Sequence, residues 1–158
     1  MNRNEFPNGA TLVFGGSGGI GQGVALEFAR AGVPVAVAYR TKAEVAERVA
    51  GQIREEGVNA SIHQVDVTDA EQVKVTVDAA IEAHGRVHTV VWAAGPFVNQ
   101  LHISEMSQDD WQRAIGVEVM GFFNTIKAAL PHLRAAGGGS FVTLGSAGHL
   151  RWPDRAGE

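Results

Sequence analysis

A run of glycines between an apolar segment and a helical pattern is the part of this sequence best suited to binding chemistry. Gly15-Gly16-Ser17-Gly18-Gly19-Ile20-Gly21 follows the apolar residues 11–14 and opens a segment with helix-spaced apolar residues. Small residues there let backbone N–H groups approach a pyrophosphate held at the helix N-terminus. We therefore expect a dinucleotide to contact Gly15, Ser17, Gly18, Gly19, Ile20 and Gly21. A strand-to-helix turn without a ligand is the simpler alternative, and a P-loop is excluded because no Gly-Lys-Ser/Thr follows.

Two cations follow the second apolar run, in the sequence Tyr39-Arg40-Thr41-Lys42. In a dinucleotide fold this position faces the adenosine ribose, where an acidic residue accepts from the 2′-hydroxyl of NAD. Arg40 and Thr41 are therefore predicted to bind a 2′-phosphate, which favours NADP(H) over NAD(H). The alternative is that Arg40 and Lys42 are only the solvated beginning of a helix.

Metal chemistry is not expected. The chain has no Cys, and its six His share no metal-ligand spacing. The absence of Cys also excludes disulfides and thiolate catalysis.

The elements that would position these residues alternate strictly along the chain. Strands are predicted at residues 11–14, 33–39, 60–65, 87–93 and 140–145, and helices at 20–31, 42–56, 70–84 and 108–136. Parallel neighbours need a helix to return the chain, so this order predicts an α/β, doubly wound parallel sheet with strand order 3-2-1-4-5. The ligand crevice should lie where the order reverses, after the first and fourth strands.

Length and composition limit the class of protein. The chain has 158 residues, 45% of them apolar, and a net charge of −4, which predicts one globular domain over residues 1–158 with an irregular tail at 146–158. The acidic balance disfavours a nucleic-acid partner. No apolar run reaches membrane-spanning length and no signal peptide is visible, so we expect a cytoplasmic protein without a membrane partner.

Five motifs in order resemble the short-chain dehydrogenase/reductase family. They are the Gly-x-x-x-Gly-x-Gly spacing at 15–21, Asp66-Val67, Ala94-Gly95, the long helical segment 111–133, and the segment 140–146 that ends at Ser146. The resemblance implies a Rossmann-type fold that transfers hydride between a nicotinamide cofactor and a carbonyl or alcohol substrate. It further implies that Asp66 and Val67 meet the adenine, that Ala93, Ala94 and Gly95 line the ribose side, and that Ser146 hydrogen-bonds the substrate oxygen.

The sequence departs from that family in three places. Trp92-Ala93 stands where the family has Asn-Asn, and Glu118 stands where its long helix carries a catalytic Asn. Glu118 could relay protons itself, or it could mark lost or relocated catalysis. Tyr39 is the only tyrosine, so the family's Tyr-x-x-x-Lys motif is missing. We therefore expect the C-terminal part of the family fold to be absent from this sequence, as in a fragment of a longer enzyme, which we favour, or in a natural half-domain, and this chain alone to be inactive.

The predicted function is that of an NADP-dependent oxidoreductase. Apolar residues of the segment 108–136 exceed what one core face needs, which predicts a homo-oligomer, a dimer or tetramer, through this helix. The first alternative is a non-catalytic dinucleotide-binding or scaffolding protein of the same fold. A methyltransferase is a more distant alternative, because the glycine loop of methyltransferases lacks residues equivalent to Ile20-Gly21.

Overall fold

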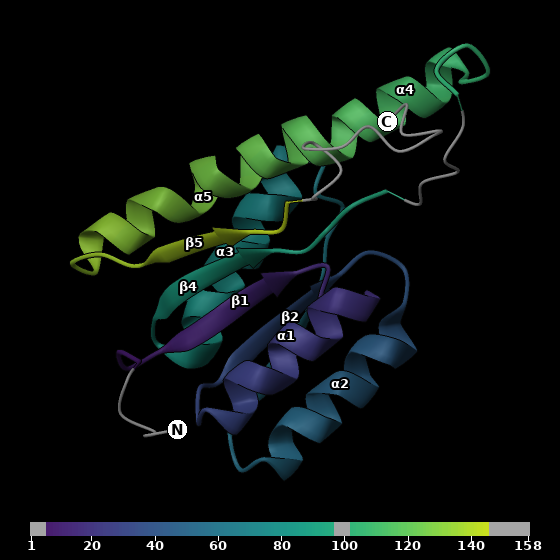
Figure 1. The fold of residues 1–158 in the computed structure, drawn as a ribbon. Coiled ribbons are helices and arrows are strands. Elements are labelled where there is room, and N and C mark those ends of the chain that lie inside the picture. The colour runs from purple at the N-terminus through teal and green to yellow at the C-terminus, as the bar shows by residue number, and fades with distance from the viewer. Residues whose placement is uncertain (1–5, 97–101, 146–158) are drawn as a thin grey trace.

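Five strands form one parallel sheet, and helices connect them. The computed structural model describes residues 6–96 and 102–145 (Figure 1). The strands are β1 (Ala10–Phe14), β2 (Val35–Tyr39), β3 (Ala60–Gln64), β4 (Val87–Trp92) and β5 (Ser140–Thr143). The helices are α1 (Gly19–Arg30), α2 (Ala43–Glu55), α3 (Ala70–His84), α4 (Gln108–Ile115), η1 (Gly116–Gly121) and α5 (Phe122–Ala135). The sheet order is β3-β2-β1-β4-β5 with every neighbouring pair parallel, which confirms the predicted α/β fold.

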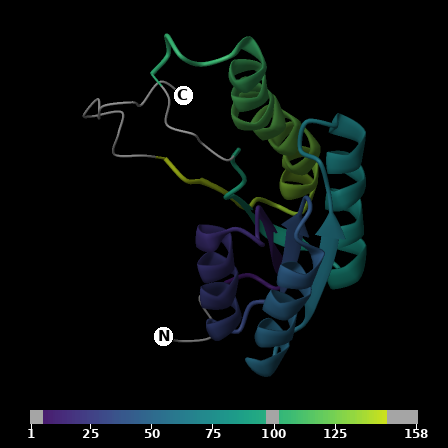
Figure 2. The same cartoon turned by 90° about the vertical axis from the view of Figure 1, so that its right-hand side faces the viewer.

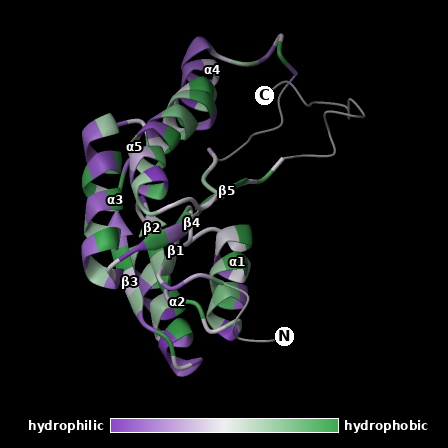
Figure 3. Cartoon of the chain, turned by 90° about the vertical axis from the view of Figure 1, so that its left-hand side faces the viewer, coloured by the Kyte–Doolittle hydropathy of each residue, from purple (hydrophilic) through white to green (hydrophobic). Residues whose placement is uncertain are grey.

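The helices cover the two faces of the sheet in separate layers. Figure 2 shows α1 and α2 on one face and α3 and α5 on the other. Successive side chains of a strand point to opposite faces, and β1 follows this rule. Val13 packs in the cluster beneath α1 and α2, whereas Leu12 and Phe14 pack in the cluster beneath α3 and α5. The outer side of α3 carries mostly hydrophilic residues, as expected for a helix with one face in the core (Figure 3).

The centre of the sheet sets the position of the candidate site. β1 pairs with β2 on one side and with β4 on the other, and Phe14 is in register with Trp92. The residues that follow these two strands, Gly15 and Ala93, therefore lie next to each other at the carboxyl edge of the sheet. This is the point where the strand order reverses, and it is where a crevice for a ligand was predicted.

The predicted long helix 108–136 consists of three segments. Ser107 caps α4, its Oγ accepting from the Asp110 N–H at 3.1 Å. Residues 116–121 then form a π-helical segment, η1, before α5 continues in ordinary α geometry. Within the described residues, no helix is both long enough and apolar enough to span a bilayer.

Candidate functional site

The glycine loop after β1 is tight because its own backbone fills the space that side chains would need. Gly15 has φ 78°, in the region that favours glycine. The Gly18 N–H donates to the Gly15 carbonyl at 2.8 Å and the Gly16 N–H to the Ala38 carbonyl at 2.9 Å. A Cβ on Gly21 would overlap the Gly15 carbonyl oxygen. These contacts explain why the first and third glycines of the spacing cannot carry a side chain.

The first turn of α1 is open to an anion. Gly18 is its N-cap and offers no side-chain hydrogen bond, and the first turn contains no acidic residue. The first N–H groups of a helix lack partners within the helix and lie at the positive end of its dipole. The loop therefore presents backbone donors without a competing carboxylate on its own turn.

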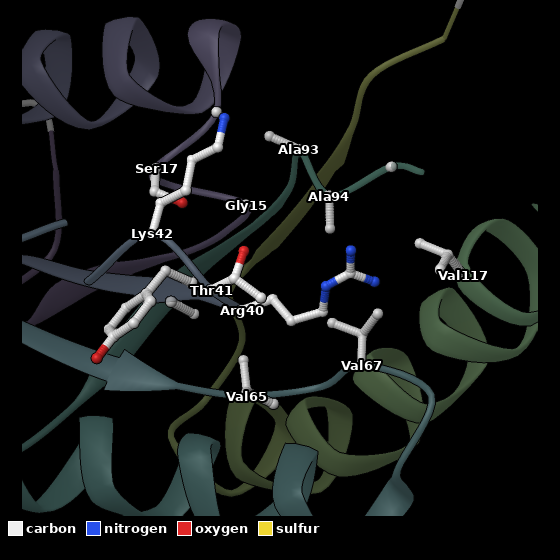
Figure 4. Close-up of a pocket in the computed structure, with 14 residues that line it drawn as sticks. Gly15, Ser17, Arg40, Thr41, Lys42, Val65, Val67, Ala93, Ala94 and Val117 are labelled. Carbon is white, nitrogen blue, oxygen red and sulfur yellow. The ribbon is translucent and has the colours of Figure 1, made fainter. Parts of the chain in front are cut away.

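A cleft at the carboxyl edge of the sheet brings most of the predicted cofactor residues together (Figure 4). The predicted residues that line it are Gly15, Ser17, Gly18, Arg40, Thr41, Val67, Ala93, Ala94 and Gly95. Asp66 lines a second, adjoining pocket that shares Arg40 and Thr41 with the cleft. Gly19 and Ile20 instead line an apolar groove along α1 beside Phe6. Gly21 is buried under the loop.

The cations after β2 reach this cleft without acidic partners. Figure 4 shows the Arg40 side chain extending across the cleft toward the side lined by Ala94, Val67 and Val117. Among the described residues, no carboxylate oxygen lies within 4.0 Å of the charged groups of Arg40 or Lys42. The Arg40 backbone is fixed, since its carbonyl accepts from Gln64 Nε2 at 3.0 Å. The guanidinium is thus available for a negatively charged ligand.

Hydrogen bonds shape the loop between β3 and α3. Asp66 Oδ1 accepts from the Thr68 N–H at 3.0 Å and from Thr68 Oγ1 at 2.7 Å. The Asp66 N–H donates to Gln72 Oε1 at 3.0 Å. Asp69 caps α3, and hydrogen bonds from Gln72 and Glu71 lower the pKa of its carboxyl. Asp66 is therefore held in one orientation at the pocket adjoining the cleft.

Glu118 lies beside the loop that follows β4. Its Oε1 is 2.9 Å from the position that a Cβ on Gly95 would occupy, so any side chain at Gly95 would displace the carboxylate. Glu118 keeps solvent access, yet partial burial raises the pKa of its carboxyl. Ser146, the other predicted catalytic residue, lies outside the described residues.

Sequence reasoning missed several residues at this site. Val65 and Val117 line the cleft, and neither was predicted as a contact. Gly121 and Asn124 of the long helix meet Val67 from behind the cleft. The signal for Asn124 was its spacing: it lies three residues after Gly121, so both share one helix face, and an amide on an apolar face calls for a partner.

The fold and this site define a Rossmann-type α/β protein. More specifically, the chain belongs to the short chain dehydrogenase family, whose family model matches residues 10–156. This confirms the resemblance noted in the sequence.

Curated relatives are similar over nearly all of this chain. The 3-oxoacyl-[acyl-carrier-protein] reductase FabG of Staphylococcus aureus is 33% identical over 137 residues, covering 87% of this chain and 55% of the relative. Sorbose reductase sou1 of Schizosaccharomyces pombe is 31% identical over 148 residues, covering 92% and 58%. The chain therefore spans somewhat more than half the length of these relatives.

Solved structures agree with this relationship. A crystal structure of NAD+-bound xylitol dehydrogenase superposes with a TM-score of 0.90 at 28% identity, covering 96% of this chain and 58% of the other. A short-chain type dehydrogenase/reductase from Mycobacterium ulcerans gives a TM-score of 0.86 at 30% identity, covering 96% and 57%.

Proposed function

We propose that this chain binds a nicotinamide dinucleotide and supplies the cofactor-binding part of an oxidoreductase acting on a carbonyl or alcohol substrate. The observation that carries the proposal is a single cleft in which an open helix N-terminus and Arg40, which has no carboxylate partner among the described residues, face the same space. The similarity to xylitol dehydrogenase, whose structure is described as NAD+-bound, supports a nicotinamide cofactor. The similarity to reductases and dehydrogenases supports redox chemistry over a scaffolding role.

The residues present fit such a cofactor. Five of the seven loop residues are glycines without a Cβ, which lets backbone N–H groups of the loop and of the first turn of α1 approach a pyrophosphate. Val65, Val67 and Val117 form an apolar wall on which an adenine ring can lie, and the Asp66 carboxylate can accept from its amino group. Ala93, Ala94 and Gly95 leave room for a ribose because their side chains are small or absent. When bound, the nicotinamide supplies the hydride.

Arg40 is proposed to select the phosphorylated cofactor. A guanidinium can donate two parallel hydrogen bonds to a phosphate, whereas it gains less from a free 2′-hydroxyl. Thr41 and Lys42 stand next to it on the same cleft and add a hydroxyl donor and a second positive charge. We therefore propose NADP(H) as the preferred cofactor.

Glu118 and Ser146 are proposed as the polar groups on the substrate side. A carboxyl whose pKa is raised by burial is better placed to exchange protons near neutral pH than an ordinary surface glutamate. Hydride transfer to a carbonyl also needs a proton donor, which the resemblance assigns to the tyrosine of the Tyr-x-x-x-Lys motif, and we do not propose that Glu118 alone replaces it. Tyr39, the only tyrosine, ends β2 beside the cations. We propose that the 158-residue chain binds dinucleotide but does not turn over a carbonyl substrate.

Calorimetric titration with NADP+ and NAD+ tests the cofactor proposal. We expect NADP+ to bind more tightly, and Arg40→Asp to weaken NADP+ binding by about 10- to 100-fold, the range for losing charge-assisted hydrogen bonds. NAD+ binding should change much less.

Arg134→Asp is the matched control, because it makes the same charge change at the far end of α5. If Arg40→Asp and Arg134→Asp shift NADP+ affinity equally, only the overall charge matters and the role of Arg40 is wrong. If the unmodified chain binds neither dinucleotide, the proposed function is wrong.

A further inference from the structure

Asn124 is a buried polar side chain that joins two segments far apart in the sequence. It is 8% exposed, and its Nδ2 donates to the Val67 carbonyl at 3.1 Å and reaches the Thr68 carbonyl at 3.5 Å. Both carbonyls belong to the loop between β3 and α3. The bond therefore connects α5 to the loop that forms one side of the cleft.

The same loop meets the long helix at a second point, one turn earlier. A Cβ on Gly121 would lie 2.8 Å from Cγ2 of Val67 and 3.0 Å from Cη2 of Trp92. The helix backbone thus approaches Val67 so closely at Gly121 that a residue with a side chain would not fit there. Gly121 and Asn124 hold Val67 by packing and by a hydrogen bond, respectively.

Val67 is itself a lining residue, and Val117, which belongs to η1, lies beside it on the same side of the cleft. Wide π-helical turns are uncommon and have poorer geometry than α-helix, so their position depends on contacts to the rest of the fold. Asn124 provides a hydrogen bond that crosses from the helix just after this turn to the Val67 loop. The neighbouring buried hydroxyl of Thr125 instead donates within its own helix, to the Gly121 carbonyl at 2.9 Å.

We propose that Asn124 is a positioning residue of the dinucleotide cleft: through the Val67 carbonyl, it fixes the spacing between the Val67 loop and the turn that carries Val117. This inference rests on the proposed function, because it assigns the adenine end of the dinucleotide to that spacing. Removing the amide leaves the buried Val67 carbonyl without its donor, and the loop must move to regain a partner.

The test compares Asn124→Leu and Asn124→Asp with the control Thr125→Val. Leucine has no hydrogen-bond donor, and an ionised aspartate only accepts, so neither side chain can donate to the Val67 carbonyl when the titration is run at a pH where the aspartate is ionised. Thr125→Val also deletes one buried hydrogen bond on the same helix, but one that does not reach the loop. ADP-ribose, which carries the adenine end without the nicotinamide, is titrated at a temperature where each variant is fully folded.

We expect both Asn124 variants to bind ADP-ribose about fivefold more weakly, as the loss of one buried hydrogen bond implies, while Thr125→Val binds like the unmodified chain. Equal affinities for all variants, or equal losses for Asn124→Leu and Thr125→Val, would overturn the positioning role while leaving the proposed function intact. No binding of ADP-ribose by the unmodified chain would overturn the proposed function and this inference with it.

A second test uses the unmodified chain, so its result does not depend on whether a variant folds. The side-chain amide resonance of Asn124 should shift when ADP-ribose is added, because the bound ring presses on the loop that accepts its hydrogen bond. An unchanged resonance at saturating ADP-ribose contradicts the inference.

Discussion

Two glycines of α1 allow binding to be separated from folding at the level of single residues. A Cβ added to Gly19 or to Gly23 meets no atom within 4 Å, so alanine fits at both positions. Gly19 lines the groove beside Phe6, yet it directly follows the N-cap Gly18, which lines the cleft, so it begins the turn that the pyrophosphate is proposed to approach; Gly23 lies one turn further along the helix. Alanine keeps the backbone N–H, but its methyl group would hold the pyrophosphate away from this turn. We therefore expect Gly19→Ala to weaken dinucleotide binding by about tenfold or more, the effect of losing one charge-assisted hydrogen bond.

Gly23→Ala serves as the control and should leave binding unchanged. Neither variant should lower the free energy of unfolding, because alanine is favoured over glycine within a helix. Titration with NADP+ and urea unfolding measure the two effects. Tight binding by Gly19→Ala would show that the pyrophosphate does not approach this turn.

Residue types and spacing predicted most of the residues that the structure brings together in the cleft, where they are continuous in sequence. The glycine loop and Arg40 could be predicted because a strand end, a turn and a helix start carry local signals. The contacts of Gly121 and Asn124 with Val67 could not, because they join positions more than fifty residues apart. The spacing from Gly121 indicates that Asn124 shares its helix face, but the partner of the amide depends on how α5 packs on the sheet, and no local pattern identifies that partner.

At the scale of elements, the π-helical segment η1 contains two glycines in unequal surroundings. A Cβ on Gly116 would lie 3.8 Å from the Thr68 methyl group, which is ordinary van der Waals contact. A Cβ on Gly121 would press on Val67 and Trp92. We expect Gly121→Ala to lower the free energy of unfolding by about 1–3 kcal/mol, as overpacking of a core does, and Gly116→Ala to be close to neutral.

Urea unfolding followed by circular dichroism measures both variants. Equal stabilities of Gly116→Ala and Gly121→Ala would mean that the helix can move away from Val67 without cost. That result would also weaken the case for a fixed cleft spacing.

A histidine pair links the edge strand β3 to the end of α3. Ser61 Oγ lies 2.8 Å from His63 Nε2 and 2.8 Å from His84 Nε2. Burial lowers the pKa of both imidazoles, and the proximity of His84 lowers that of His63 further. Because the folded chain disfavours the protonated imidazoles, their contribution to stability is present above a pH of about 6.5 and is lost as the pH falls below it.

We therefore expect the free energy of unfolding to fall between pH 7.5 and pH 5.5, and to fall less in the double variant His63→Gln/His84→Gln. Buried His88, whose pKa burial also lowers, is common to both proteins and cancels in the comparison. His102→Gln, at an exposed position, is the control and should keep the original slope. The same slope in the double variant would contradict the prediction.

The order of the elements could be predicted almost completely, but the interior of the long helix could not. Hydrophobic periodicity and capping residues mark where helices begin and end. A π-helical turn changes which carbonyl each N–H bonds to, but it leaves the apolar residues close to helical spacing. The apolar pattern across residues 108–136 therefore predicted one continuous helix, where the structure has three segments. In the structure the ring of Phe122, the residue that begins α5, packs against Trp92 with centroids 6.0 Å apart.

At the scale of the whole molecule, the long helix leaves an apolar surface uncovered. Its exposed apolar residues are Trp111, Ile115, Val119, Met120, Phe123 and Leu130. Apolar surface gathered on one element favours association. We expect the chain to form a dimer or tetramer through this surface, and Phe123→Glu to shift it toward monomer in sedimentation velocity experiments.

Val75→Glu is the matched control, since Val75 is about as exposed as Phe123 but lies on α3. It should leave the sedimentation coefficient unchanged. A chain that sediments as a monomer at all working concentrations would contradict the prediction.

The central position of β1 has a consequence for the order of folding. β1 comes first in the chain, yet its partner β4 follows only after α1, α2 and α3. Pairings between distant segments form slowly, because a long loop must close before the contact is made. We expect the unit from β1 to β2 to assemble early while the other edge of β1 stays open. Since the cleft needs both Gly15 and Ala93, it is completed only when β4 docks, and ligand binding would report the late stage of folding.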